Sequence, residues 1–542
     1  MNNVKVLSDE IVDQQTSQER FLEILLKNRG LDKNFLEKID VKDIRPTDFG
    51  IKQKDFDKAI DLIKESIKKQ EKIIIYGDYD VDGITSTALV WKAIFPKNKN
   101  VKPIIPDREK DGYGLNTKTV ENYCQKNDFW PELLILVDNG IVAQKEIKKL
   151  KKKINKIIII DHHLKNDLKN EADAVIHSPD TSASVLSYLV ARFFEPKTNC
   201  ELATLGLIGD MANIANVFNR NIAIEGIKLI NQGKNIGVKK ILEISGTDNK
   251  KADEWTVGFV IGPRINASGR MGDATRALRL LSFSDETILE KLAIELETEN
   301  KNRQTEERKI MDKFLSKNYE SEKIIVEIDN IHPGIIGLLA GKLCERFGKP
   351  SIVVTNINKE IYKGSARSIE GFDITKFLRK NEDLFESLGG HKSAAGFSIK
   401  AKNFSKWLKR IKKTNSTIKA KAVTLSCDAK MKLGAVKIKN FEFIKSLKPF
   451  GEGNKSPLFL FEKLRIIDKR TIGKDQSHLK IWVDDPKTSA VERMVVEGIG
   501  WGKNKETTNL KIGDMVSVVA SLNLNEYMGK RQVELMVKEI MF

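Results

Sequence analysis

Acidic residues and histidines stand directly after several apolar runs of this sequence. The runs IIIY at 73–76, LLILV at 133–137, IIII at 157–160 and LATLGLIG at 202–209 each lead into one or more of them. The residues concerned are Asp78, Asp80, Asp82, Asp138, Asp161, His162, His163 and Asp210. Carboxylates and imidazoles are common metal ligands, so this set predicts a metal site.

Several carboxylates in one place repel one another unless positive charge lies between them. A pair of divalent cations would satisfy them. A carboxylate-rich site with an imidazole suits Mn²⁺ or Mg²⁺ better than a tetrahedral, sulfur-lined zinc site. Two such ions about 3.5–4 Å apart activate a water and stabilise the leaving oxygen of a phosphoryl group. The residues therefore favour phosphoryl chemistry.

Each of these residues also has an ordinary alternative. A single Asp after a strand is most often a helix cap or a turn residue, and a single His is most often a polar side chain with its partners satisfied. One helix start needs only one capping Asp, whereas the loop at 78–83 carries three. The joint occurrence of the acids favours a site over a set of separate caps.

Parallel strands would bring these residues together. Four short apolar segments, at 72–76, 133–137, 156–160 and 173–177, alternate with helical stretches. Near-continuous apolar strands of this kind are typical of a parallel sheet covered by helices on both faces, that is, an α/β fold. Ligands bind at the carboxyl ends of the strands in such sheets. The run before Asp210 is expected to be a further strand ending at the same edge.

Sequence patterns divide the whole chain into five expected segments. We expect a helical extension over 1–49, an α/β catalytic domain over 50–284, a connector helix with a solvated polar middle over 285–319, and a second α/β domain over 320–408. Over 409–542 we expect a basic linker (409–422) followed by a small β-barrel, because short alternating runs separated by turn residues are typical of barrels.

Composition limits the function classes. The net charge of +18 suits a polyanionic partner such as nucleic acid, although lysine-rich surfaces produce the same surplus. No apolar run is long enough to span a bilayer, and the first residues lack the features of a secretory signal. The four cysteines are scattered without paired spacing, which favours a reducing compartment. We expect a cytoplasmic protein, and a monomer.

The motifs resemble those of a known family. YGDYDVDG, VDNG, DHH and the later GD resemble the motifs of the DHH phosphoesterases. PDREKDGYGLN, GPRINASGRMGDA, HPGIIGLLAGKL, GSARSIEGFD, GGHKSAAGF and PFGEGNKSP follow in the order found in the RecJ family. The resemblance covers nearly the whole chain. It implies a DHH domain, a DHHA1 domain and a C-terminal OB-fold barrel.

The resemblance also implies roles for single residues. The ligands of two Mn²⁺ or Mg²⁺ ions would be Asp80, Asp82, Asp138, His162 and Asp210. Asp161 would orient His162 from behind, His163 would face the substrate, and Asp78 would support the site. In small-substrate relatives a histidine ligand stands where this chain has Tyr76.

Substrate contacts follow from the same resemblance. The residues implied are Arg108, Arg264, Arg270, Ser365, Arg367, Gly389, Gly390 and His391. For any one arginine the alternative is a surface salt bridge, and for the two glycines it is a tight turn. On the barrel, Phe450, His478, Lys480, Tyr527 and Lys530 would hold a single strand, whereas Phe459 and Trp482 are expected in the core.

The function implied is 5′→3′ exonuclease action on single-stranded DNA in repair and recombination, with release of 5′-mononucleotides. A helicase and a single-strand-binding protein are the partners implied. One alternative is a hydrolase of short oligonucleotides or dinucleotides, which the extra barrel and the charge disfavour. The other is a DNA-binding scaffold without activity, which the complete ligand set disfavours.

Overall fold

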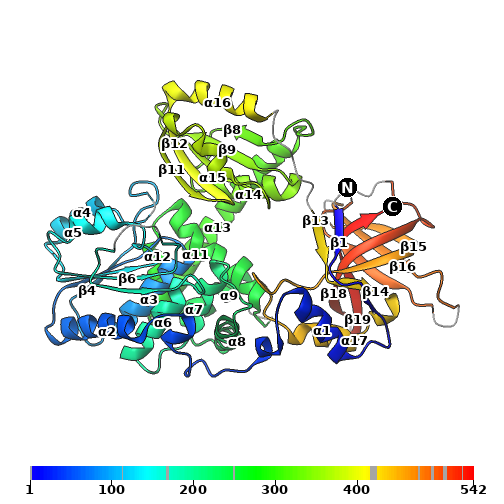
Figure 1. Ribbon diagram of the computed structural model, residues 1–542, viewed down its shortest axis with the longest axis horizontal. Coiled ribbons are helices and arrows are strands. Elements are labelled where there is room, and N and C mark those ends of the chain that lie inside the picture. The colour runs from blue at the N-terminus through cyan, green and yellow to red at the C-terminus, as the bar shows by residue number, and fades with distance from the viewer. Residues whose placement is uncertain are drawn as a thin grey trace. The chain divides into compact units, whose positions relative to one another are not determined.

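The structure is a computed structural model of the chain (Figure 1). It describes residues 3–112, 114–165, 170–247, 251–415, 424–473, 476–489, 493–504, 509–527 and 529–542. The chain forms two compact units. The barrel unit comprises Met1–Lys38, Ile214–Val217 and Ala422–Phe542, and the α/β unit comprises Ile39–Asn213 and Phe218–Lys421.

A five-stranded, fully parallel sheet forms the first half of the α/β unit. Its order is β4-β3-β5-β6-β7. The strands are β3 (Ile73–Tyr76), β4 (Val101–Ile104), β5 (Leu133–Val137), β6 (Lys156–Asp161) and β7 (Ala174–His177). The predicted parallel sheet is confirmed. Strand β4 escaped prediction because Lys102 and Pro103 interrupt its short apolar run.

Helices cover both faces of this sheet. Ile73 and Ile75 belong to one core, whereas Ile74 and Tyr76 belong to another. Alternate residues of each strand point to opposite faces, so both faces need apolar side chains. The first core includes residues of α2 (Gln53–Lys68), α3 (Val81–Ile94), α6 (Ala183–Phe194) and α7 (Glu201–Gly209); the second includes residues of α4 (Thr117–Asn127) and α5 (Gln144–Leu150).

The run before Asp210 is a helix, so the predicted fourth strand end is wrong. Residues Glu201–Gly209 form α7, and Asp210 is the cap residue at its C-terminus. The run is rich in Leu, Ala and Gly rather than β-branched residues, and Leu and Ala favour helix. Seven of its residues are buried, so the helix is apolar on every side and lacks the amphipathic period that identifies surface helices.

Further helices follow this half of the unit along the chain. They are α8 (Val217–Asn231), α9 (Ile236–Ser245), α10 (Glu254–Thr256), α11 (Gly262–Met271), α12 (Thr275–Ser282) and α13 (Glu286–Leu315), with a π-helical turn at Val257–Ile261. The long helix α13 was predicted, but its polar middle is not solvated throughout. Asn300, Arg303 and Glu307 are buried, and Arg303 binds both of the others. Mutual hydrogen bonds make this burial possible.

A second sheet, of mixed direction, follows α13. Its order is β11-β12-β10-β9-β8, and only β8 and β9 run parallel. The elements are β8 (Ile325–Ile328), α14 (Ile336–Phe347), β9 (Ser351–Asn356), β10 (Ile361–Arg367), α15 (Ile374–Arg379), β11 (Phe385–His391), β12 (Ala394–Lys400) and α16 (Ala401–Asn415). The segment predicted as a linker, 409–422, therefore begins as the last turns of α16. Residues 416–423 lie outside the described residues.

The barrel unit contains a closed five-stranded barrel. Strand β15 (Phe459–Ile472) pairs with both β16 and β18, which closes the order β15-β16-β17-β19-β18. The other strands are β16 (His478–Asp484), β17 (Val496–Gly500), β18 (Met515–Tyr527) and β19 (Lys530–Met541). Phe459 lies in the core, as predicted, but Trp482 does not. The side chain of Tyr527 is outside what the structure describes.

The N-terminal segment is part of the barrel unit. β1 (Asn3–Val6) pairs with β13 (Thr424–Cys427), and β2 (Ile11–Val12) pairs with β14 (Ala429–Met431). The helices α1 (Gln18–Asn28) and α17 (Ile438–Ser446) add residues to the same core. The prediction of an entirely helical start is therefore wrong for residues 3–12, because their strand partners are more than 400 positions away in the sequence.

A buried ion pair holds this segment to the barrel. Arg29 Nη1 lies 2.6 Å from Asp428 Oδ1, with both side chains 10% exposed. Asp428→Ala would leave the Arg29 charge without its partner, so we expect a local loss of stability of about 2 kcal/mol. Hydrogen-exchange mass spectrometry should then show faster exchange in α1 and β14, with the α/β unit unchanged. Unchanged exchange in α1 would contradict this role for the pair.

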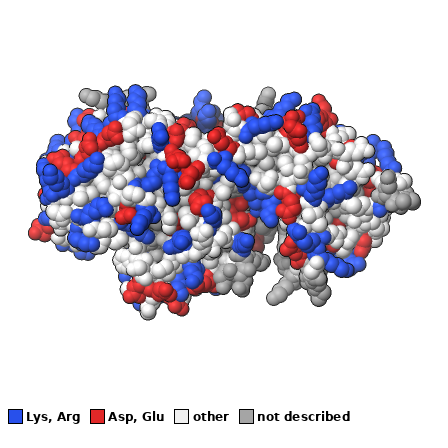
Figure 2. All heavy atoms as spheres, turned by 90° about the horizontal axis from the view of Figure 1, so that it is seen from below, with Lys and Arg blue, Asp and Glu red and all other residues white. Residues whose placement is uncertain are grey.

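Charge is spread rather than concentrated on the face drawn in Figure 2, where Lys and Arg lie among acidic and neutral residues.

None of the described helices combines the length and apolar character needed to cross a membrane.

Candidate metal centre

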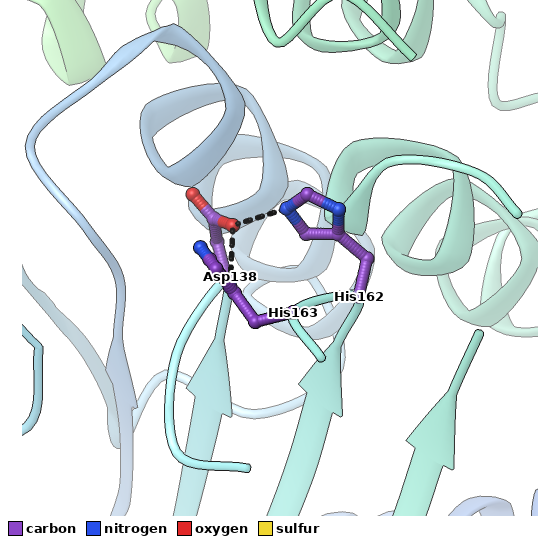
Figure 3. Close-up of side chains that lie close together, drawn as sticks. All are labelled: Asp138, His162 and His163. Carbon is purple, nitrogen blue, oxygen red and sulfur yellow. Dashed lines mark ion pairs between the residues drawn. The ribbon is translucent and has the colours of Figure 1, made fainter. Parts of the chain in front are cut away.

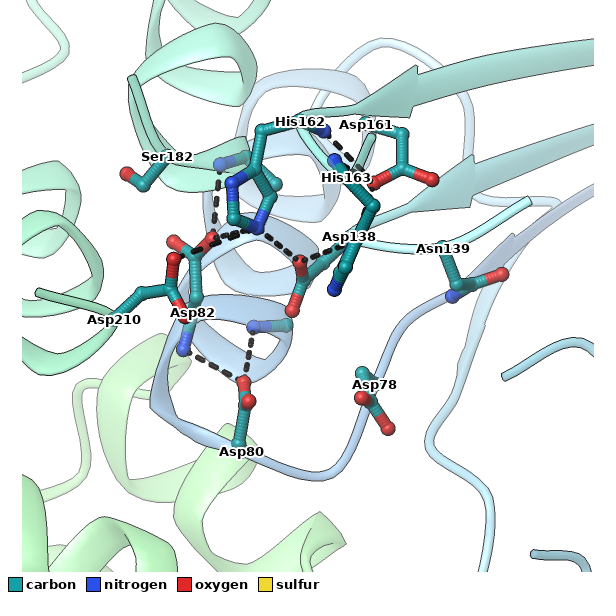
Figure 4. A network of polar contacts seen from close by, with 12 residues as sticks. Asp78, Asp80, Asp82, Asp138, Asn139, Asp161, His162, His163, Ser182 and Asp210 are labelled. Carbon is teal, nitrogen blue, oxygen red and sulfur yellow. Dashed lines mark hydrogen bonds and ion pairs between the residues drawn. The ribbon is translucent and has the colours of Figure 1, made fainter. Parts of the chain in front are cut away.

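Carboxylates and histidines meet at the carboxyl edge of the parallel sheet (Figure 4). Strands β3, β5 and β6 are neighbours in the sheet, and their ends carry the loop 78–83, Asp138 and the pair His162-His163. Asp210 comes from the end of α7. The four segments predicted to converge do converge, although the last arrives on a helix.

His162 lies at the middle of the cluster. Its Nε2 is 3.2 Å from Asp138 Oδ1, 3.5 Å from Asp210 Oδ2 and 3.8 Å from Asp82 Oδ2. Figure 3 shows the imidazole directed at Asp138. Within the described residues, His162 Nε2 and Asp138 Oδ1 are buried atoms without a hydrogen-bond partner. Buried polar atoms normally have partners, so this pair fits a bound cation.

Three groups of side chains are arranged so that each could hold an ion. They are Asp82, His162 and Asp210; Asp138, His162 and His163; and Asp78, Asp80 and Asp138, with ligand atoms within 4.8 Å of one another in each group. Asp138 and His162 each occur in two groups. The donor set is rich in carboxylate oxygens and has no sulfur, which suits Mn²⁺ or Mg²⁺.

The acids also destabilise one another's charged forms. Burial, followed by the charge of Asp80, raises the pKa of Asp78 to about 8. Burial and the charge of Asp82 raise the pKa of Asp210 to about 8 and that of Asp138 well above its usual value. A cation between them would remove this cost, so the residues present fit the metal ions that the sequence predicts.

Hydrogen bonds to the first turns of two helices hold the loop 78–83 in place. Asp80 caps α3: its Oδ1 accepts hydrogen bonds of 3.0 Å from the backbone N–H groups of Asp82 and Gly83. Asp82 in turn accepts from the backbone N–H groups at the start of α6, those of Ala183 and Ser184. A side chain at Gly83 would lie 2.6 Å from the backbone of Asp78, so this turn requires glycine.

Asp138 adopts a strained conformation. Its φ is +59°, in the left-handed region that non-glycine residues seldom occupy. Its backbone N–H donates to the Ile160 carbonyl on β6 at 2.9 Å, which helps to hold the turn. Such strain is concentrated at functional sites.

Asp161 accepts the backbone N–H of His162 at 2.8 Å, but its carboxylate contacts the imidazole of His163 and not, as the sequence predicted, that of His162. Asp161 Oδ1 lies 2.8 Å from His163 Nδ1, and its Oδ2 accepts from the backbone N–H of Ile141. Burial disfavours the His163 cation, but the hydrogen bond and charge of Asp161 outweigh it and raise the pKa of His163 to about 9. The Asp161 carboxylate therefore favours the cationic form of His163.

Three of the predicted arginines lie near one another. Burial and the neighbouring Arg108 and Arg303 lower the pKa of Arg270 to about 10, and burial and Arg108 lower that of Arg367. Arg108 stacks over the ring of Tyr79, 5.1 Å from its centroid. Arg367 Nη1 donates to Ser365 Oγ at 3.2 Å. Arginine side chains offer planar pairs of donors that suit phosphate and carboxylate oxygens.

The other predicted substrate residues lie in two places, on α11 and on the second sheet. Arg264 is paired with buried Glu297 at 2.5 Å and donates to the Val260 carbonyl. Gly389 and Ser365 both pair with Gly396, and His391 and Arg367 both pair with Ala394. This register places all four on one face of the second sheet. Gly390 adjoins them with φ +141°.

Three family models match successive parts of this chain. The DHH family N-terminal domain matches residues 72–222, the DHHA1 domain matches 321–417, and the RecJ OB domain matches 427–539. The single-stranded-DNA-specific exonuclease RecJ of Bacillus subtilis is 31% identical over 504 residues, which is 89% of this chain. The chain therefore combines a DHH, a DHHA1 and a RecJ OB domain, and it is similar to RecJ over most of its length. It spans 62% of the length of that RecJ and 60% of the Thermus thermophilus RecJ, but 90% of the Haemophilus influenzae RecJ, to which it is 27% identical.

Solved RecJ structures agree with this assignment. The Thermus thermophilus RecJ structure in complex with Mn²⁺ is similar with a TM-score of 0.82 at 25% identity, covering 100% of this chain and 79% of that one. A second, an exonuclease RecJ bound to manganese, has a TM-score of 0.60 at 29% identity, covering 68% of this chain and 96% of that one.

Proposed function

We propose that this chain is a metal-dependent exonuclease that degrades single-stranded DNA from its 5′ end and releases 5′-mononucleotides. The observation that carries the proposal is the buried cluster of carboxylates around His162, with a cluster of arginines next to it. RecJ proteins of bacteria are named single-stranded-DNA-specific exonucleases, which supports the same substrate here.

The ligand set proposed for two ions is Asp80, Asp82, Asp138, His162 and Asp210. Asp138 is a member of two of the candidate groups, so it is suited to contact both ions. When bound, the ions supply a water activated at neutral pH and stabilise the charge on the leaving oxygen. RecJ structures with Mn²⁺ and with Mg²⁺ support either metal.

The charged side chains around the acids would hold the substrate. Arg108, Arg270 and Arg367 provide planar donors for phosphate oxygens, and arginine suits this through paired hydrogen bonds. His163, whose Nδ1 lies 2.8 Å from Asp161, belongs to a candidate ligand group with Asp138 and His162 and would face the substrate beside the acids. Together these groups orient the scissile phosphate, and positioning is a major part of phosphoryl-transfer catalysis.

The barrel would also bind the single strand. Along β16 the core takes Leu479 and Ile481, so Lys480 and Trp482 face outward. The Trp482 ring has Arg470 and Lys480 within 5.0 and 5.2 Å of its centroid. Trp501 is 58% exposed. Exposed rings beside basic side chains are the usual means by which OB-folds bind single strands.

One assay tests the proposal. Purified protein with Mn²⁺ or Mg²⁺ is given DNA labelled at either end, single- or double-stranded, and a parallel sample contains chelator. We expect mononucleotides to be released progressively from the 5′ end of single strands only, and none with chelator. Cleavage confined to very short oligonucleotides, or binding without hydrolysis, would contradict the proposal.

A further inference from the structure

We infer that Asn266 is a positioning residue for the metal centre: it completes the cap of α3 and thereby fixes the peptide that joins Asp80 to Val81. The inference rests on the metal ligands proposed above. Asn266 lies on α11, outside every group of candidate ligands among the described residues.

The first turn of α3 has four N–H groups that the helix itself cannot satisfy. Here these are the N–H groups of Asp80 to Gly83, because the first bond within the helix runs from the Ile84 N–H to the Asp80 carbonyl. The Asp80 carboxylate accepts those of Asp82 and Gly83. Within the helix this leaves the N–H of its first residue, Val81, which is 2% exposed. Asn266 Oδ1 accepts it at 2.9 Å. The cap of this helix is therefore shared between Asp80 and Asn266, a residue 185 positions after Val81.

The orientation of Asp80 depends on this bond. Asp80 holds the helix with one carboxylate oxygen, and its carboxylate is also part of a candidate metal group. Rotation of the Asp80–Val81 peptide would move that carboxylate relative to Asp138. By fixing the Val81 N–H, Asn266 prevents the rotation, and a buried N–H left without an acceptor is costly.

Backbone contacts make α11 a rigid support for this bond. A side chain at Gly269 would collide with the Tyr79 carbonyl oxygen, and one at Gly334 would collide with the Arg270 carbonyl oxygen. The last turn of α11 is thus packed between the loop 78–83 and the segment before α14. Arg270, at this same turn, donates to the Gly334 carbonyl. One short helix therefore sets both the metal loop and an arginine of the cluster.

The test measures Mn²⁺ binding directly, from the electron paramagnetic resonance signal of free Mn²⁺. We expect Asn266→Ala to raise the dissociation constant about tenfold, because a buried N–H loses its acceptor. Asn266→Asp, which retains an oxygen at the same position, should restore most of the affinity. Asn235→Ala is the matched control: Asn235 also accepts a helix-start N–H, that of Val238, and donates to the Leu281 carbonyl, but at α9. It should bind Mn²⁺ as the wild type does.

The outcomes separate the possibilities. A folded Asn266→Ala protein that binds Mn²⁺ with wild-type affinity would overturn the inference while leaving the proposed function intact. Equal weakening by Asn266→Ala and Asn235→Ala would also overturn it, because the effect would then be general destabilisation. A wild-type protein that binds no Mn²⁺ would overturn the proposed function and this inference with it. If Asn266→Ala does not fold, Asn266→Ser, whose hydroxyl is too short to reach Val81, takes its place with the same expectation.

Discussion

Asp138→Asn is expected to lower the rate of DNA hydrolysis at least about a thousandfold while leaving the fold intact. Asparagine has the same shape but lacks the charge that we propose to lie between the two ions. Without metal the variant should be at least as stable as the wild type, because burial and the neighbouring acids already disfavour the Asp138 carboxylate, whose pKa is well above its usual value.

Two measurements check this expectation. The wild type should gain thermal stability with Mn²⁺ because the ion binds only the folded state, and Asp138→Asn should lose that gain. Asp173→Asn is the matched control, since Asp173 precedes β7 and binds Lys151 and the Ile157 N–H at the opposite edge of the sheet. The control should retain hydrolysis within about twofold, the range expected for a site remote from the chemistry. Equal activity of Asp138→Asn and the wild type would remove Asp138 from the site.

Arg270→Met is expected to lower kcat/KM about a hundredfold, equivalent to about 2.7 kcal/mol, and yet to raise the melting temperature. Arg270 is partly buried among like charges, and burial with Arg108 and Arg303 lowers its pKa to about 10. Without an anion this arrangement costs stability, so an apolar side chain of similar length should relieve it. Binding sites commonly trade stability for function in this way.

Inorganic sulfate distinguishes this explanation from a simple packing effect. Sulfate should raise the melting temperature of the wild type, because the arginine cluster binds it, and should raise that of Arg270→Met less. Arg264→Met should behave in the opposite way and lose stability, since it leaves the buried Glu297 charge unpaired. An Arg270→Met protein with full activity would exclude Arg270 from substrate binding.

The sequence predicted the parts of the site that depend on local pattern. β-branched runs marked β3, β5 and β6, and the edge where they end followed from the parallel arrangement. The prediction of a strand before Asp210 was wrong because a fully buried helix and a buried strand have the same apolar composition. The RecJ-like motifs carried the identity of the ligands, which periodicity alone did not give.

Contacts between distant segments were beyond such reasoning. Which of the two histidine rings the Asp161 carboxylate contacts depends on how the chain turns after β6. The pairing of β1 with β13 joins residues at the two ends of the sequence. Asn266 stood inside a recognised motif, GPRINASGRM, but nothing in the spacing indicated that its partner was the Val81 N–H.

The pairing of β1 with β13 has a consequence for synthesis on the ribosome. The first 38 residues belong to a unit whose other strands begin only after residue 421. At about 5–20 residues per second, they emerge roughly 20–80 s before those partners exist. During this interval the α/β unit is completed as a nascent domain, while Phe21 and Leu25 lack the core that later buries them. A chaperone that binds short apolar segments would therefore be expected to engage the nascent N-terminus first.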